Sequence, residues 1–240
     1  MKSSLRLQEN QWKNKLTFGV FMEYERIRDY LLSIENEADK DLCSMRIYAQ
    51  ENDVPIVRTE TESFLRTLCF MKKPKRILEI GTAIAYSTIV MARADETGES
   101  HIVTIESYDK RIPIATENLK RAGLIGNEYG CDRVELIHGD ATKVLKELDE
   151  SFDLIFLDAA KGQYINWLPD IMRLMKSGSV LISDNVLQDN TVMESRYTVD
   201  RRDRTTHDRM RSFLRELKQN ERLMSSIVPI GDGVSISVMK

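Results

Sequence analysis

The carboxyl-terminal end of the chain constrains its fold more than any other feature. Two strand-like segments, Leu223 to Pro229 and Val234 to Met239, are joined by only four residues, Ile230 to Gly233. A link this short cannot hold a crossover helix, so the segments are expected to pair as an antiparallel hairpin. Upstream, five short β-branched runs alternate with helix-length stretches, which predicts parallel strands covered by helices on both faces. The runs are Arg76–Ile80, His101–Ile105, Arg133–Ile137, Asp153–Leu157 and Ser179–Ser183.

The chain is therefore predicted to be a Rossmann-like α/β protein with a seven-stranded, mostly parallel sheet. Apolar residues recur at helical spacing from Phe18 to Met71, with a break near Pro55, so three helices are expected before the first strand. We expect one domain over residues 1–240, in which the helices of residues 1–71 precede a core of residues 72–240. The irregular segment from Gln188 to Thr206 is long enough to suggest a functional role.

Charge and hydropathy exclude several classes of protein. The formal net charge of -3 gives no overall attraction to nucleic acid, so contact with a polyanion requires a local basic patch. The three cysteines form no CxxC pair of the kind that binds zinc or exchanges disulfides. No segment approaches the roughly 18 apolar residues that a membrane helix needs. A cytoplasmic protein without a membrane partner is expected.

The segment that follows the first predicted strand is the strongest sign of a ligand site. A strand, a tight turn from Gly81 to Ser87 and a helix amino terminus form a ligand crevice at the carboxyl end of a parallel sheet. Gly81 lets the backbone approach a ligand closely. A dinucleotide fingerprint requires further glycines, but Ala83 and Tyr86 occupy those places. The turn therefore suits a ligand without a pyrophosphate, with Gly81, Ala83 and Ser87 as candidate contacts.

Acidic residues stand at or near the ends of the first three predicted strands. Glu79 precedes the turn and is expected to face the ammonium group of a ligand that carries an amino acid. Glu106 ends the second strand, where a carboxylate can accept both ribose hydroxyls, and Asp140 follows the third. The alternative is that these acids only cap the helices that come after them.

The fourth and fifth predicted strands end in oxygen-bearing side chains. Asp158 follows one strand, and Asp184 and Asn185 follow the next. Adjacent strand ends lie about 5 Å apart, so two carboxylates and an amide are expected to converge beside the turn. Such ligands favour magnesium, manganese or calcium. The alternative is that the two aspartates merely end strands and cap turns.

The sequence resembles the metal-dependent O-methyltransferases, which include the catechol and caffeoyl-CoA enzymes, over about Met45 to Lys240. The resemblance rests on the segments YAQENDVPI, KRILEIGTAIAYS and PIGDGVSIS, and is closest to bacterial tRNA 5-hydroxyuridine methyltransferases. It implies a class I methyltransferase fold, S-adenosylmethionine as cofactor, Mg²⁺ or another divalent cation on Asp158, Asp184 and Asn185, and a homodimer. The family usually has glycine where this chain has Ala85, which affects the turn but not the expected cofactor.

Lys161 follows Asp158 by three residues and matches the catalytic lysine of that family. A bound cation lowers the pKa of a coordinated hydroxyl. A lysine whose own pKa is depressed can take the proton, and the oxygen anion then attacks the sulfonium methyl in line. Asp158 is expected to bind the cation, to contact the cofactor and to act in catalysis. The alternative is that Lys161 is a solvated loop charge.

The acceptor needs two adjacent oxygens, which both a catechol and 5-hydroxyuridine supply. Residues 196–211 carry six arginines and three aspartates, a surplus of three positive charges. Arginine suits phosphate, so Arg196, Arg201, Arg202 and Arg204 are predicted to form a basic rim that contacts RNA. The alternative for these arginines is a solvated, self-paired helix face.

The predicted reaction is therefore methylation of 5-hydroxyuridine at the tRNA wobble position to 5-methoxyuridine. The alternative acceptor is a small catechol-like phenol or a caffeoyl-CoA-like thioester. A dehydrogenase is disfavoured by the turn, and a non-catalytic regulator by the combination of Asp158 with Lys161. The histidines, His101, His138 and His207, share no common spacing and are not predicted as ligands or bases. Tyr164 and Trp167 are predicted to anchor a helix to the sheet, with a place in the wall of the pocket as the alternative.

Overall fold

The computed structural model describes residues 26–35, 39–126, 132–188 and 191–240. The chain divides into two compact units, one ending at Asp39 and one from Lys40 to Lys240. In the first unit, residues 26–33 form a helix. The second unit begins with α2 (Lys40–Glu51) and α3 (Thr59–Lys72). The described residues thus contain the three helices expected before the first strand.

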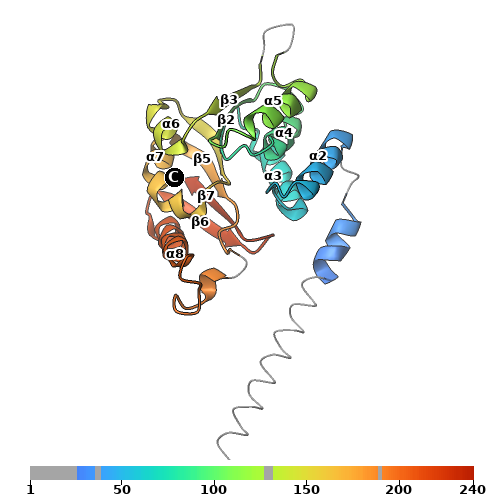
Figure 1. Ribbon diagram of the computed structural model, residues 1–240. Coiled ribbons are helices and arrows are strands. Elements are labelled where there is room, and N and C mark those ends of the chain that lie inside the picture. The colour runs from blue at the N-terminus through green and yellow to red at the C-terminus, as the bar shows by residue number, and fades with distance from the viewer. Residues whose placement is uncertain (1–25, 36–38, 127–131, 189–190) are drawn as a thin grey trace, which may run out of the picture. The chain divides into compact units, whose positions relative to one another are not determined.

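The second unit is a mixed sheet with helices on both faces (Figure 1). Its strands are β1 (Arg76–Ile80), β2 (His101–Glu106), β3 (Val134–His138), β4 (Phe152–Leu157), β5 (Met175–Ser183), β6 (Leu223–Val228) and β7 (Val234–Met239). Their order across the sheet is β3-β2-β1-β4-β5-β7-β6. Strands β1 to β5 pair in parallel, whereas β7 pairs antiparallel with both β5 and β6. This confirms the seven-stranded sheet and its terminal hairpin.

Alternate residues of the central strands face two separate cores, because successive side chains of a strand point to opposite faces. Ile77 and Ile102 pack with residues of α2 to α5, whereas Leu78 and Val103 pack with residues of α6 to α8. Figure 1 shows these two groups of helices on opposite sides of the sheet. The helices after β1 are α4 (Tyr86–Ala94), α5 (Ile112–Arg121), α6 (Ala141–Glu147), α7 (Tyr164–Arg173) and α8 (Arg204–Gln219). None of the described helices is long and apolar enough to cross a membrane.

The structure refines the predicted limits of two segments. Strand β5 starts at Met175 instead of at Ser179, and its pairing with β4 shifts register between Phe152 and Leu154. The predicted irregular segment contains the 3-10 turn η2 (Thr191–Met193), and α8 begins at Arg204, two residues before the expected end. The polar residues Lys176 to Gly178 gave no strand pattern, which explains the shorter prediction.

Ala85 adopts the left-handed conformation that usually favours glycine. Its φ is 67° at the amino terminus of α4, and its side chain is fully buried. This conformation costs a residue with a Cβ roughly 1–2 kcal/mol, while glycine loses about 0.5–1 kcal/mol more backbone entropy on folding. Ala85→Gly is therefore expected to raise the free energy of unfolding by about 0.5–1 kcal/mol, measured by urea denaturation. The matched control is Ala92→Gly within α4, which should lose about 1 kcal/mol. Equal losses in both variants would contradict the strain argument.

Candidate active site

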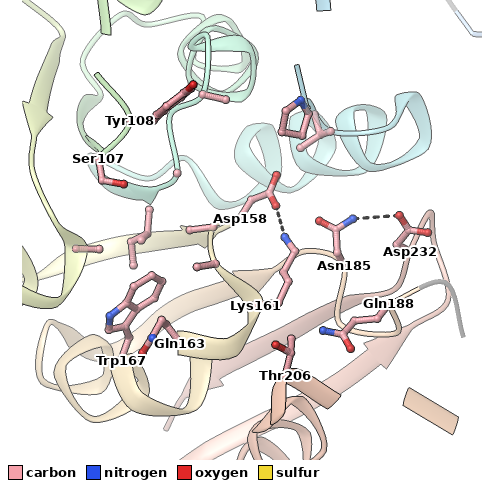
Figure 2. A pocket seen from close by; sticks show the side chains of 18 of the residues that line it. Ser107, Tyr108, Asp158, Lys161, Gln163, Trp167, Asn185, Gln188, Thr206 and Asp232 are labelled. Carbon is pink, nitrogen blue, oxygen red and sulfur yellow. Dashed lines mark hydrogen bonds and ion pairs between the residues drawn. The ribbon is translucent and has the colours of Figure 1, made fainter. Parts of the chain in front are cut away.

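A cavity of about 1280 Å³ opens at the carboxyl ends of the parallel strands. This is the edge at which ligands bind in open α/β sheets. Figure 2 shows Ser107 and Tyr108 on one side of the cavity, and Gln188 and Thr206 on the other. Asp158 and Lys161 lie between the two sides. Most of the predicted cofactor, metal and catalytic residues line this cavity: Gly81, Ala83, Ser87, Glu106, Asp140, Asp158, Lys161 and Asn185.

The turn after β1 brings bare backbone to the wall of the cavity. Gly81 has a φ of 105°, and a Cβ there would lie 2.1 Å from the carbonyl oxygen of Asp158. The Gly81 N–H donates to the carbonyl oxygen of Ile105 at 3.0 Å, which ties the turn to β2. Only glycine fits this position, because both the conformation and the space exclude a side chain.

Glu106 is held by the backbone of two loops. Its Oε2 accepts the Ala83 N–H at 2.8 Å, and its Oε1 accepts the N–H groups of Ser107 and Tyr108 at 2.9 and 2.8 Å. A carboxylate offers about four acceptor sites, so about one remains for a ligand hydroxyl. These bonds leave room for one strong hydroxyl contact on the carboxylate instead of two, and the predicted ribose contact stays a prediction.

Asp140 fits both interpretations that the sequence left open. Its Oδ1 accepts the Thr142 N–H at 2.8 Å, which caps α6, and this bond lowers the pKa of Asp140. The residue also lines the cavity. Capping therefore accounts for its local geometry, and its predicted cofactor contact stays a prediction.

Glu79 lies behind the cavity instead of on its surface. The carboxylate is fully buried and accepts hydroxyl bonds from Ser87 at 2.6 Å, from Thr104 at 2.6 Å and from Thr88. Among these partners, Ser87 lines the cavity. Burial raises the pKa of Glu79 to about 7, although the hydroxyl bonds act to lower it. The predicted contact with an ammonium group stays a prediction, and the structure gives Glu79 a role in fixing Ser87.

The raised pKa of Glu79 predicts a pH-dependent stability. The folded value of about 7 exceeds the ordinary value of 4.5, so the folded state holds the proton more tightly. Protonated Glu79 therefore contributes up to about 3 kcal/mol to the free energy of unfolding. This contribution is complete below pH 4.5 and is lost as the pH rises through 7. Glu79→Gln removes this dependence. The difference in free energy of unfolding, variant minus wild type, should therefore be about 2–3 kcal/mol larger at pH 8 than at pH 5. An unchanged difference at the two pH values would contradict the assignment.

The predicted metal ligands lie at adjacent strand ends. The Asp158 N–H donates to Ile80 and the Asp184 N–H donates to Leu157, both at 3.0 Å, which aligns the ends of β1, β4 and β5. Asp184 is only 2% exposed, and burial together with the charge of Asp158 raises its pKa to about 7. Asn185, the next residue, adopts the left-handed backbone conformation, with a φ of 55°.

The amide of Asn185 is oriented by the β6–β7 turn. Its Nδ2 donates to Oδ2 of Asp232 at 3.2 Å, and Asp232 in turn pairs with Arg58 at 2.6 Å. Figure 2 shows the amide oxygen of Asn185 turned to the side of Asp158 and Lys161. Within the described ranges, no three His, Cys, Asp or Glu side chains converge as metal ligands. A cation here would therefore depend on two carboxylates and this amide oxygen, a donor set that suits a hard divalent ion.

Lys161 pairs directly with Asp158. Its Nζ lies 2.6 Å from Oδ1 of Asp158 and 3.1 Å from the hydroxyl oxygen of Tyr164. Burial alone would lower the pKa of Lys161, but the interactions with Tyr164 and Asp158 outweigh it and raise the pKa above its usual value. The expected depressed pKa is therefore wrong for this geometry, because the lysine faces a carboxylate instead of another cation. The alternative of a solvated loop charge does not fit a side chain that is 24% exposed and ion-paired.

Tyr164 belongs to the site, although the sequence favoured a packing role for it. Its hydroxyl lies 3.1 Å from the carbonyl of Leu157 and 3.3 Å from that of Asp184, and accepts the Ala159 N–H at 3.2 Å. The ring packs edge-on against Phe213 of α8. Tyr164 thus links the ends of β4 and β5 to Lys161. Its position three residues after that lysine, at the start of a helix, was the available signal.

The four predicted RNA-binding arginines lie beside the cavity and not in its described lining. Arg196 pairs with Asp208 at 3.1 Å, and Arg202 lies 3.4 Å from Asp203. Arg204 donates to the carbonyl of Val199 at 3.1 Å. Arg201 is exposed. The expected basic rim therefore does not line the substrate mouth, because these side chains turn to local carboxylates and carbonyls or to the surface.

Comparison with known proteins agrees with this geometry. Residues 33–240 match the model of the O-methyltransferase family. A catechol O-methyltransferase from Niastella koreensis is 30% identical over 181 residues, which cover 73% of this chain and 79% of that protein. The chain belongs to the O-methyltransferase family. A caffeoyl-CoA O-methyltransferase from Citrus natsudaidai is 24% identical over 90% of this chain and 95% of that protein.

Solved structures of other methyltransferases share the fold of this O-methyltransferase. The SAH-bound methyltransferase of Podospora anserina has a TM-score of 0.79 and 26% identity, covering 91% of this chain and 96% of that one. TomG of Streptomyces achromogenes, solved in complex with SAM, has a TM-score of 0.77 and 25% identity, covering 90% and 96%. The seven-stranded sheet with its terminal hairpin is therefore a methyltransferase fold.

Proposed function

We propose that this protein transfers a methyl group from S-adenosylmethionine to one of two adjacent oxygens on a planar ring, with the help of a divalent cation. The observation that carries the proposal is the meeting of the Gly81 turn, the Asp158–Lys161 pair and Asn185 in one cavity. SAH and SAM occupy two of the related structures. In this chain, the bare backbone at Gly81 and the remaining acceptor site of Glu106 suit such a ligand.

Asp158, Asp184 and Asn185 would hold the cation, with Mg²⁺ expected and Mn²⁺ or Ca²⁺ as alternatives. When bound, a cation stabilises the anionic form of a ring hydroxyl. Lys161 in its neutral form would accept the hydroxyl proton. The charge of Asp158 raises the lysine pKa, and a cation held by Asp158 would reduce that effect. Tyr164 keeps the amine in place through its 3.1 Å contact. Most of the rate then comes from holding oxygen and methyl group in line at about 3 Å.

A small catechol-like phenol is the acceptor class that the relatives favour, since they include a catechol and a caffeoyl-CoA enzyme. A second candidate is 5-hydroxyuridine in tRNA. It is supported by the motifs that resemble tRNA methyltransferases and by the arginines beside the cavity, of which Arg196 and Arg202 have side chains 59% and 84% exposed. A base inserted into the cavity would place its phosphates near these side chains.

The test is transfer of labelled methyl groups from S-adenosylmethionine, with Mg²⁺ present, to catechols and to tRNA that contains 5-hydroxyuridine. Label in methoxyphenols supports the first acceptor class, and label in 5-methoxyuridine after digestion supports the second. In the RNA case, Arg201→Ala and Arg202→Ala should weaken RNA binding and leave the methylation of free catechol unchanged. The absence of label in both acceptors would contradict the proposed function.

A further inference from the structure

His207 of α8 is buried in the cavity wall without a hydrogen-bond partner. The residue is 1% exposed and lines the cavity. Neither Nδ1 nor Nε2 makes a hydrogen bond to the described part of the protein. Oδ1 of Asp208 lies 3.5 Å from Nδ1, and the other oxygen of that carboxylate pairs with Arg196. Buried polar groups are nearly always hydrogen-bonded, so an unsatisfied imidazole calls for an explanation.

The position of His207 points to the acceptor half of the cavity. Its neighbour Thr206 contacts the loop that carries Lys161, with Oγ1 3.3 Å from where a Gly162 Cβ would lie. Arg209 donates to the carbonyl of Gly162 at 3.1 Å, which fixes the first turns of α8 against this loop. Figure 2 shows Thr206 and Gln188 on the side of Lys161 away from Ser107 and Tyr108. The first turns of α8, which carry His207, are therefore anchored to the segment that carries Lys161.

We propose that His207 is a substrate-binding residue whose imidazole, buried in the wall of the cavity, turns to hydrogen-bond a third polar group on the acceptor ring, outside the two adjacent oxygens. This inference rests on the proposed function, and it narrows the substrate class to rings that carry a third hydrogen-bonding group. A neutral imidazole offers one donor and one acceptor, so it can pair with a carbonyl, a hydroxyl or an imide N–H. A site built to bond a polar group discriminates strongly against the analogue that lacks it, because its own buried group then stays unpaired.

The test compares wild type with His207→Phe, which keeps a planar ring and removes both nitrogens, and with His207→Gln, whose amide can restore a donor near the Nε2 position. Binding of three probes to SAH-loaded protein is measured by calorimetry. Catechol carries no third polar group, whereas 3,4-dihydroxybenzaldehyde and an RNA oligonucleotide with 5-hydroxyuridine do. Ser212→Ala, on the exposed side of α8, is the matched control.

His207→Phe is expected to weaken binding of at least one of the two polar probes about tenfold or more and to change catechol binding less than twofold. His207→Gln should recover part of the loss, and the melting temperature of His207→Phe should equal or exceed that of wild type. If His207→Phe bound each of the three probes as tightly as wild type does, the proposal would be overturned. An equal loss of affinity for all three probes, catechol included, would also overturn it. Methyl transfer by wild type is measured separately, so a protein that binds the probes without methylating them contradicts the proposed function and not the role of His207.

Discussion

Lys161→Met is expected to lower kcat for methyl transfer by about 10³-fold, within the range that a positioned general base contributes. Among the described residues that line the cavity, Lys161 is the one lysine. Its amine already contacts Asp158, the residue predicted to bind the cation. Methionine keeps the length and apolar stem of the side chain but cannot accept a proton. Steady-state methyl transfer measures the loss, and calorimetry with S-adenosylmethionine checks that the cofactor still binds.

The matched control for this variant is Lys146→Met on the exposed face of α6. It should leave kcat within about twofold. A general base also sets the pH dependence of the rate, so residual activity of Lys161→Met should rise with hydroxide concentration more steeply than wild-type activity. If Lys161→Met retained a tenth or more of wild-type kcat, the proton would have to go elsewhere and the assigned role would be wrong.

Asp184→Asn is expected to separate stability from metal binding. The buried carboxylate stands beside Asp158, and burial and that charge raise its pKa to about 7. Its ionised form is therefore unfavourable near neutral pH when no cation is present. Asparagine should raise the free energy of unfolding in chelator by about 1 kcal/mol or more. It should also weaken Mn²⁺ binding at least tenfold, because one of two carboxylate ligands is lost.

Urea denaturation in chelator and Mn²⁺ titration followed by electron paramagnetic resonance measure the two effects. Asp149→Asn, on the exposed loop before β4, is the control and should change neither. A variant that is destabilised in chelator and binds Mn²⁺ normally would show that Asp184 has a structural role only. That result would move the predicted cation site away from the end of β5.

The positions of the site residues could be predicted because they follow from the order of the strands. Gly81, Glu106, Asp158 and Asn185 come directly after or at the ends of parallel strands, and such ends must meet at one edge of the sheet. The pattern of side chains within a strand is strictly alternating. Sequence alone therefore places the cavity at this edge of the sheet and predicts several of the residues that line it.

The pKa values, burial and side-chain directions of the residues depend on contacts between parts of the chain that are distant in sequence. The sequence could not predict these properties. The raised pKa of Lys161 results from how its side chain folds back onto Asp158 and Tyr164. His207 appears on the sequence as one residue in an arginine-rich helix, and only the packing of α8 against the Lys161 loop buries it in the cavity. The arginines around it show a charge surplus, but their pairing with local groups decides which way they point.

Methyl transfer in this cavity is expected to require a divalent cation. The most direct measurement is the initial rate of labelled methyl transfer from S-adenosylmethionine to the best acceptor, in chelator and after the addition of excess Mg²⁺. The predicted result is loss of nearly all activity in chelator, its full return with Mg²⁺, and unchanged binding of S-adenosylmethionine throughout. Activity that persists in chelator would contradict the roles assigned to Asp158, Asp184 and Asn185 as ligands.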